Sequence, residues 1–129
     1  MVRILVVDDS KLARKRTING VAQAEIQHEI IGEAEDGDVA FELYKELKPN
    51  LIITDLEMPN MDGLTLIKLI RKEDKETSII VVSSMANEKV KQALKTDRYA
   101  DFIKKPMDKK MMEMLLLKVE NKINKKKVM

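Results

Sequence analysis

The chain has 129 residues, which is enough for one hydrophobic core and leaves no room for a second domain of ordinary size. Its 24 basic and 22 acidic side chains give a net charge of +2, which does not favour direct binding to nucleic acid. The absence of cysteine excludes disulfides and cysteine-based sites, and no apolar run is long enough to span a membrane, so we expect a cytoplasmic protein with no membrane partner.

Strand and helix patterns alternate along the sequence. Short apolar runs predict strands at 4–7, 29–34, 51–54, 79–82 and 100–104. Between and after them, mostly apolar residues recur at helical spacing and predict five helices. The first has the weak stripe Ala13, Thr17, Val21 and Ala24, and the second has Val39, Ala40, Leu43, Tyr44 and Leu47. The third has Leu66, Ile67 and Ile70, the fourth has Val90, Ala93 and Leu94, and the fifth has Met112, Leu115, Leu116, Val119 and Ile123. Successive βα units of this kind predict a parallel sheet with helices on both of its faces.

Local signals give the limits of these elements. Ser10 and Asn87 are expected to cap the first and fourth helices, and Pro49 follows the end of the second. We expect residues 1–124 to form the domain. Residues 125–129, which carry three consecutive lysines, are expected to form a basic tail, with fraying from about residue 122 onward.

Polar residues follow four of the expected strands at the points where they end: Asp8-Asp9, Asp55, Ser83-Ser84 and Lys105-Pro106. In a parallel sheet these ends lie along one edge, where open α/β sheets bind ligands. A single aspartate at a strand end is most often a turn former, but a second strand that ends in the same way weakens that explanation. Three carboxylates in one place repel each other unless a cation lies among them, so the cluster predicts a metal ion.

The expected chemistry is phosphoryl transfer onto Asp55. A carboxylate can attack phosphorus and form an aspartyl phosphate, and that reaction needs mainly alignment and charge neutralisation. Mg²⁺ suits the site because it prefers hard oxygen ligands, which Asp9, Asp55 and the backbone carbonyl of Glu57 could supply. Lys105 could pair with Asp55 or with a phosphoryl oxygen.

These strand-end residues, together with the segment Asp-Leu-Glu-Met-Pro-Asn-Met-Asp-Gly at 55–63, resemble the receiver domain of two-component response regulators. Within that family the chain is most similar to the single-domain chemotaxis regulators of the CheY type. The resemblance covers residues from about 3 to about 122. It implies an α/β, flavodoxin-like doubly wound (βα)5 fold whose five-stranded parallel sheet has the order 2-1-3-4-5, with helices on both faces.

The resemblance also implies the roles of the site residues. Asp55 would be the phosphoacceptor, loaded from a histidine kinase. The metal, Mg²⁺ or Mn²⁺, would be held by Asp8, Asp9, Asp55 and the carbonyl of Glu57. We therefore expect a phosphoacceptor signalling protein, not an enzyme, with slow self-dephosphorylation.

A second group of residues would respond to the phosphoryl group. Ser83 and Lys105 would bind it, and Phe102 would be the switch aromatic. The side chains of Glu57 and Met85 would modulate dephosphorylation. The changed conformation would control an effector protein at the face formed by the fourth helix, the fifth strand and the fifth helix, in chemotaxis or another pathway, with the chain a monomer or weak dimer.

Some positions depart from the commonest pattern of the family. Ser83 stands where threonine is more usual, and Phe102 where CheY-type proteins often carry tyrosine. The pair Arg98-Tyr99 replaces the usual Gly-Ala, so we expect a differently built turn there.

The basic residues of the first helix, Lys11, Arg14, Lys15 and Arg16, have two interpretations. The commoner one is a solvated face, and kinase docking is the alternative.

Alternative functions stay open at the level of sequence. A haloacid-dehalogenase-like phosphatase also uses a strand-end aspartate and Mg²⁺, but Glu57 occupies the place of its second aspartate and the chain is short for its cap. A receiver excised from a larger regulator such as a transcription factor, or a phosphorelay intermediate, would share the motifs. Leu115 stands where winged-helix transcription factors usually carry arginine in their receivers, which favours a single-domain regulator.

Overall fold

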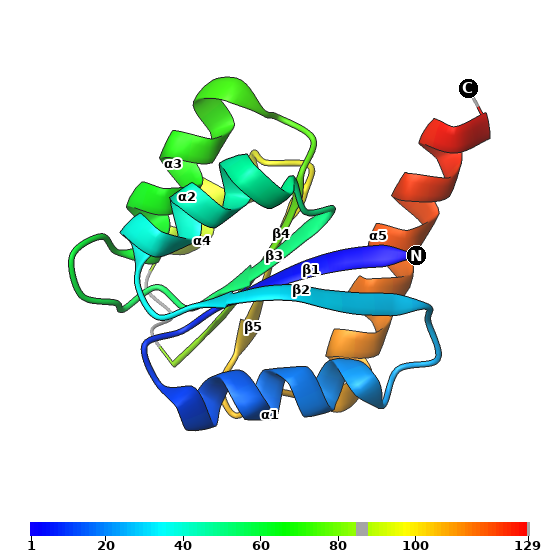
Figure 1. Cartoon of the computed structure of the whole chain (residues 1–129), viewed down its shortest axis with the longest axis horizontal. Coiled ribbons are helices and arrows are strands. Elements are labelled where there is room, and N and C mark those ends of the chain that lie inside the picture. The colour runs from blue at the N-terminus through cyan, green and yellow to red at the C-terminus, as the bar shows by residue number, and fades with distance from the viewer. Residues whose placement is uncertain (85–87, 129) are drawn as a thin grey trace.

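The computed structural model describes residues 1–84 and 88–128 and confirms the expected α/β architecture. The strands are β1 (Val2–Val7), β2 (His28–Ala34), β3 (Leu51–Thr54), β4 (Ser78–Ser83) and β5 (Ala100–Lys104). The helices are α1 (Lys11–Ala22), α2 (Gly37–Leu47), α3 (Gly63–Glu73), α4 (Glu88–Lys95) and α5 (Lys109–Val128). The strands form one parallel sheet in the order β2-β1-β3-β4-β5, as expected (Figure 1).

The helices cover the two faces of this sheet, with α1 and α5 on one face and α2, α3 and α4 on the other (Figure 1). Alternation along the strands supplies both cores, because successive side chains of a strand point to opposite faces. On β1, Ile4 and Val6 pack with α1 and α5, whereas Leu5 and Val7 pack with the other three helices. Each fully buried Ile or Leu side chain contributes about 1.5–3 kcal/mol to folding, so the two apolar layers hold the strand ends in place.

The helix caps agree with the sequence where the structure describes them. The Ser10 hydroxyl accepts a hydrogen bond from the Ala13 N–H (3.1 Å), which caps α1. Asp36 and Asp62 cap α2 and α3 in the same way. The expected cap Asn87 lies outside the described residues.

Expectations about the helices were wrong in two respects. Val39 of α2 and Ala93 of α4 are exposed, so the buried stripe of the short helix α4 consists of Val90 and Leu94. The backbone does not fray after residue 122, since α5 continues to Val128. Contacts with residues distant in the sequence explain why α5 continues: Lys122 donates to the Arg98 carbonyl (2.7 Å), and Lys126 pairs with Glu76 (2.6 Å). Within the described ranges, no helix is both long and apolar enough to cross a membrane.

Candidate functional site

Three carboxylates meet at the carboxyl ends of β1 and β3. These strands are neighbours, and the Asp55 N–H donates to the Val7 carbonyl (3.0 Å), which places Asp55 beside Asp8. Asp8 is buried and Asp9 is exposed, while the Asp55 side chain is 11% exposed. One oxygen from each of the three carboxylates lies within 4.8 Å of the others. The sequence-based expectation of an acidic cluster at this edge is therefore confirmed.

Lys105 brings an ammonium group into the cluster from the end of β5. Its Nζ donates to Asp8 Oδ2 (3.1 Å) and to Asp55 Oδ2 (3.2 Å). The Lys105 backbone N–H donates to the Ser83 carbonyl (2.9 Å), which fixes the end of β5 against the end of β4. The peptide bond from Lys105 to Pro106 is cis. One cation thus bridges two of the three carboxylates, and the pairing of Lys105 with Asp55 that the sequence suggested is present.

The site has an excess of negative charge. Burial raises the pKa of Asp8 above its usual value; the Ser10 N–H and Lys105 oppose that rise, and the charge of Asp55 adds to it. Burial alone would lower the pKa of Lys105, but its hydrogen bond to Asp8 and the charges of Asp55 and Asp8 raise it. The ammonium therefore stays charged, and one ammonium does not balance three carboxylates.

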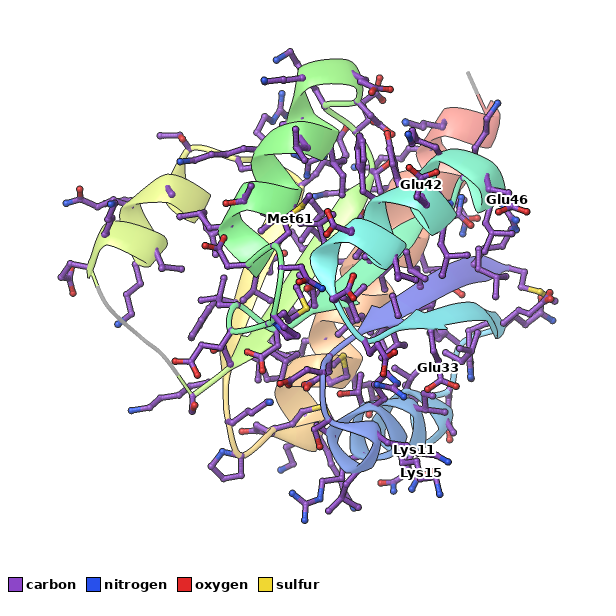
Figure 2. All side chains as sticks on the ribbon, turned by 60° about the vertical axis from the view of Figure 1, so that its left-hand side comes forward. Lys11, Lys15, Glu33, Glu42, Glu46 and Met61 are labelled. Carbon is purple, nitrogen blue, oxygen red and sulfur yellow. The ribbon has the colours of Figure 1, made fainter. Side chains whose placement is uncertain are left out.

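Arg14 positions the Asp8 backbone, a role that the sequence did not indicate. Its Nη1 donates to the Asp8 carbonyl (2.7 Å), and its Nε pairs with Glu33 Oε1 (3.0 Å). The Arg14 side chain is only 13% exposed, so the interpretation of this residue as part of a solvated face was wrong. Lys11 and Lys15 are exposed on α1, as that interpretation expected (Figure 2).

The turn after β3 holds Asp55 through close packing. The Leu56 N–H donates to Asp55 Oδ1 (2.7 Å), and the Gly63 N–H donates to the Leu56 carbonyl (2.8 Å). A Cβ atom at Gly63 would lie 2.1 Å from the Asp55 carbonyl oxygen, so only glycine allows α3 to begin this close to the strand end. Sequence reasoning used this glycine as part of a motif and missed its contact with Asp55.

The other expected site residues lie near this edge with different exposures. Ser83 is buried at the end of β4. Phe102 on β5 is partly buried and packs against the core on the side of α2, α3 and α4. The Glu57 side chain is exposed on the loop after β3. Met85 lies outside the described residues.

The donor set fits a hard divalent cation. Carboxylate oxygens are the ligands that Mg²⁺ prefers, and the cluster offers one from each of Asp8, Asp9 and Asp55 within a small volume. Burial raises the pKa of Asp8 and the charge of Asp55 adds to that rise, and a cation would offset the charge.

Comparison with known proteins gives consistent matches. Residues 4–116 match the family described as the response regulator receiver domain. The chain is 41% identical over 105 residues to the chemotaxis protein CheY of Thermotoga maritima, covering 81% of this chain and 85% of that protein. It is 38% identical over 109 residues to a protein-glutamate methylesterase/protein-glutamine glutaminase of Koribacter versatilis, covering 83% of this chain but only 30% of that relative.

A solved structure shares the fold as well. The CheX-CheY-BeF3-Mg²⁺ complex from Borrelia burgdorferi contains a chain that matches with a TM-score of 0.81 and 28% identity, over 92% of this chain and 88% of that one. The matches therefore include a relative of similar length and relatives of which this chain spans less than a third.

Proposed function

This chain belongs to the response regulator receiver domain family of two-component signalling, and from that premise we propose that Asp55 accepts a phosphoryl group from the phosphohistidine of a histidine kinase. The observation that carries the proposal is the position of Asp55. Its carboxylate lies at a strand end between two further carboxylates and the ammonium of Lys105, 3.2 Å away.

The chemistry requires alignment more than proton transfer. An Asp55 oxygen forms a bond to phosphorus while the bond from phosphorus to the donor nitrogen breaks, and the electron pair leaves with the imidazole. The Leu56 N–H donates to Asp55 Oδ1, which leaves Oδ2, now paired with Lys105, as the oxygen that attacks. After the transfer the negative charge lies on the phosphoryl oxygens, and Lys105 pairs with them in place of Asp55 Oδ2.

Asp8, Asp9, Asp55 and the carbonyl of Glu57 would hold Mg²⁺ or Mn²⁺. When bound, the metal supplies charge neutralisation for the carboxylates and the incoming phosphoryl oxygens. The carboxylate cluster supports this assignment through the spacing of its oxygens.

The switch that follows involves the ends of β4 and β5. Ser83 binds the phosphoryl group, and Phe102 moves inward into the space that Ser83 leaves. Phe102 has no hydroxyl to desolvate, so this movement costs less than it would for tyrosine. We expect beryllofluoride with Mg²⁺ to shift the ring resonances of Phe102 in wild type, and much less in Ser83→Ala. Equal shifts in both proteins would contradict the coupling.

The partners follow from the same premise. The domain signals to an effector protein through α4, β5 and α5, as a monomer or weak dimer, and chemotaxis is the pathway favoured by the name of the Thermotoga maritima relative. The receiver unit comprises residues 1–124, although α5 itself continues beyond them. These residues act as a phosphoacceptor with slow self-dephosphorylation, and Glu57 and Met85 modulate that loss.

The proposal is tested with a small phosphodonor, which removes the need for the cognate kinase. Wild-type protein incubated with acetyl phosphate and Mg²⁺ should gain the mass of one phosphoryl group. Asp55→Asn should gain none, and wild type with EDTA should gain none. Glu46→Gln, which removes an exposed carboxylate on α2, is the matched control and should load as wild type (Figure 2). Loading of Asp55→Asn at the wild-type rate would overturn the assignment.

A further inference from the structure

A groove between α3 and α4 is not used by the proposed phosphoryl chemistry. It encloses about 470 Å³. Its apolar wall is formed by Leu64 and Ile67 of α3 and by Ala93 and Leu94 of α4. One end of the groove lies at the amino edge of the sheet. Tyr99, which lines that end, accepts a hydrogen bond through its backbone carbonyl from the Ile79 N–H at the start of β4 (2.8 Å). Asp8, Asp9 and Asp55 gather at the opposite edge.

The rim of this groove is cationic. Four basic side chains line it, Lys68, Arg71, Lys75 and Arg98, against two acidic ones, Glu76 and Asp97. Both acidic groups already have partners: Asp97 pairs with Arg71 (2.7 Å), and Glu76 pairs with Lys126 (2.6 Å).

The other basic side chains of the rim are Lys68, Lys75 and Arg98. Within the described residues, Lys68, Lys75 and Arg98 form no ion pair. The groove therefore presents unpaired positive charge beside apolar surface.

Arg71 adds an unmet hydrogen-bond donor. Its Nε donates to Asp97 Oδ2 (2.7 Å), and its Nη1 donates to the Asp74 carbonyl (3.1 Å). Its Nη2 is buried and has no hydrogen-bond partner among the described residues. A buried donor without an acceptor is uncommon in a folded protein, and a carboxylate is one of the anions with which a guanidinium forms strong, charge-assisted hydrogen bonds.

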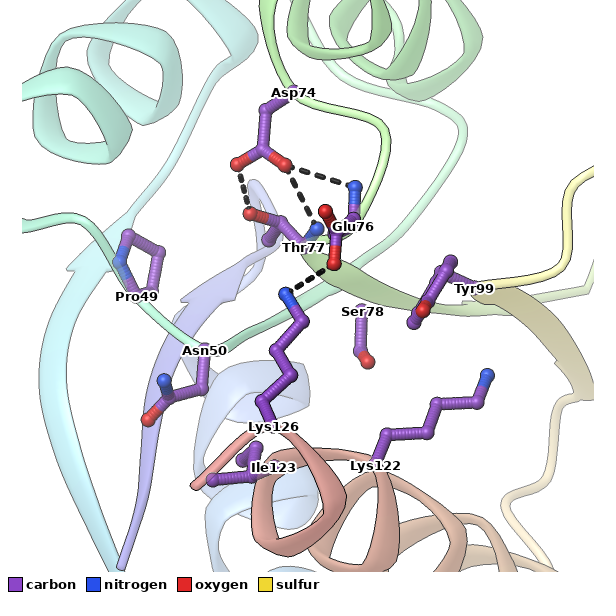
Figure 3. Close-up of a pocket in the computed structure, with 10 residues that line it drawn as sticks. All are labelled: Pro49, Asn50, Asp74, Glu76, Thr77, Ser78, Tyr99, Lys122, Ile123 and Lys126. Carbon is purple, nitrogen blue, oxygen red and sulfur yellow. Dashed lines mark hydrogen bonds and ion pairs between the residues drawn. The ribbon is translucent and has the colours of Figure 1, made fainter. Parts of the chain in front are cut away.

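Tyr99 lies between this groove and a second pocket. It lines both, and Lys122 Nζ lies 4.3 Å from the centre of its ring. The second pocket, of about 300 Å³, is more polar, and Figure 3 shows its Lys126 reaching Glu76. The lysines of that pocket are already engaged, since Lys122 donates to the Arg98 carbonyl (2.7 Å). Unpaired charge and apolar surface thus coincide in the groove between α3 and α4 and not in the second pocket.

We propose that the groove between α3 and α4 binds a small amphipathic carboxylate. The apolar body of the ligand lies against Leu64, Ile67 and Leu94, and its carboxylate lies among the guanidinium and ammonium groups of the rim. The volume falls within the range of small-molecule sites, about 300–1,000 Å³, and such sites combine apolar walls with a few polar groups that orient the ligand.

The test uses octanoate as the probe, with octanol and octylammonium as comparators of equal chain length. Titration into ¹⁵N-labelled protein should give saturable amide shifts confined to α3, α4 and the turn at 96–99. Octanoate should bind at least about tenfold more tightly than octanol, the effect expected from one charge-assisted hydrogen bond. Octylammonium should not bind, because the rim repels it.

Variants test separately how the charge of the rim and the shape of the groove contribute to octanoate binding. The double variant Lys68→Ala/Arg98→Ala should weaken octanoate binding by about tenfold and leave octanol unchanged. Ala93→Phe, which fills the groove from the exposed surface of α4, should abolish both. Lys72→Ala removes an exposed lysine of α3 that does not line the groove, and it should bind octanoate as wild type.

Three results would overturn the proposal: no saturable shifts with octanoate, equal affinity for octanol, or unchanged binding in Lys68→Ala/Arg98→Ala. None of these variants touches the acidic cluster, so each should still load a phosphoryl group from acetyl phosphate. That loading shows that a variant is folded, and it keeps a failure of the groove distinct from a failure of the proposed function.

Discussion

Asp74 organises the amino edge of the sheet through several hydrogen bonds. It accepts from the Tyr44 hydroxyl (3.1 Å), from the Thr77 hydroxyl, and from the N–H groups of Glu76 (2.9 Å) and Thr77 (3.0 Å). Burial alone would raise the pKa of Asp74, but these donors lower it below its usual value. Burial and the neighbouring carboxylate raise the pKa of Tyr44 to about 12.

These shifts set the direction of two pH dependences. A carboxyl whose pKa is depressed by folding stabilises the protein above its unfolded pKa, so the contribution of Asp74 is lost as the pH falls through its folded pKa. A phenol whose pKa is raised by folding stabilises the protein below its unfolded pKa. The contribution of Tyr44 is therefore complete below pH 10 and lost as the pH rises toward about 12.

We expect Tyr44→Phe to lower the free energy of unfolding by about 1–3 kcal/mol at neutral pH, because the partly buried, charged Asp74 carboxylate loses one donor. Urea unfolding measures the difference. The gap between wild type and variant should narrow above pH 10, where wild type loses the contribution of its neutral phenol. Tyr99→Phe is the matched control, since no hydroxyl hydrogen bond of Tyr99 is present in the described structure, and it should change stability by less than about 0.5 kcal/mol. A gap that stays constant at high pH would contradict the role of the hydroxyl.

At the scale of elements, the geometry of the site depends on the short distance between the end of β3 and the start of α3. The Asp62 side chain caps α3 by accepting from the Thr65 N–H (2.7 Å), and Gly63 lies directly on the Asp55 backbone. This contact couples the start of a helix to the position of the proposed phosphoacceptor.

We expect Gly63→Ala to destabilise the fold by about 1–3 kcal/mol, because its new methyl group would overlap the backbone at Asp55. Loading by acetyl phosphate should also slow, since α3 must move and the turn that holds Asp55 moves with it. Gly32→Ala is the control: the nearest atoms to its Cβ would be the side-chain tips of Leu47 (3.2 Å), Leu5 (3.3 Å) and Leu43 (3.8 Å), which can adjust. Thermal unfolding and loading rates of the two variants should therefore differ, and equal effects would contradict the role given to Gly63.

Elements specified by local pattern were predictable from the sequence, and long-range contacts were not. The run 51–54 and the Asp that follows it gave β3 with its boundaries, because a buried strand has a distinct composition. The role of Arg14 required knowing that α1 passes beside Glu33 of β2. The continuation of α5 depends on Lys122 and Lys126 meeting residues from distant turns, which no helical periodicity reveals.

At the scale of the whole molecule, we expect the acidic cluster to oppose folding when no cation is bound. Folding brings Asp8, Asp9 and Asp55 together, and the raised pKa of Asp8 reflects burial beside Asp55. A cation that binds only the folded chain therefore stabilises the whole domain by mass action.

We expect Mg²⁺ to raise the unfolding temperature of wild type, with about 2.7 kcal/mol of stabilisation at a hundredfold excess over its dissociation constant. Asp9→Asn should be more stable than wild type in EDTA, because it lowers the charge excess, and should gain little from Mg²⁺. Glu46→Gln should respond to Mg²⁺ as wild type, since Glu46 is an exposed carboxylate near the C-terminal end of α2 and does not belong to the acidic cluster (Figure 2). Calorimetry with and without Mg²⁺ makes the comparison, and an equal Mg²⁺ response in Asp9→Asn would remove that residue from the metal site.

The central claim, that Asp55 carries the phosphoryl group, is tested most directly by locating the modification in the chain. Borohydride reduces an aspartyl phosphate to homoserine, which marks the modified position permanently. Wild-type protein loaded with acetyl phosphate and Mg²⁺, reduced and mapped by peptide mass spectrometry, should contain homoserine at position 55 and retain aspartate at positions 8 and 9. Homoserine at position 8 or 9, or at no position in a protein that had gained phosphoryl mass, would contradict the account.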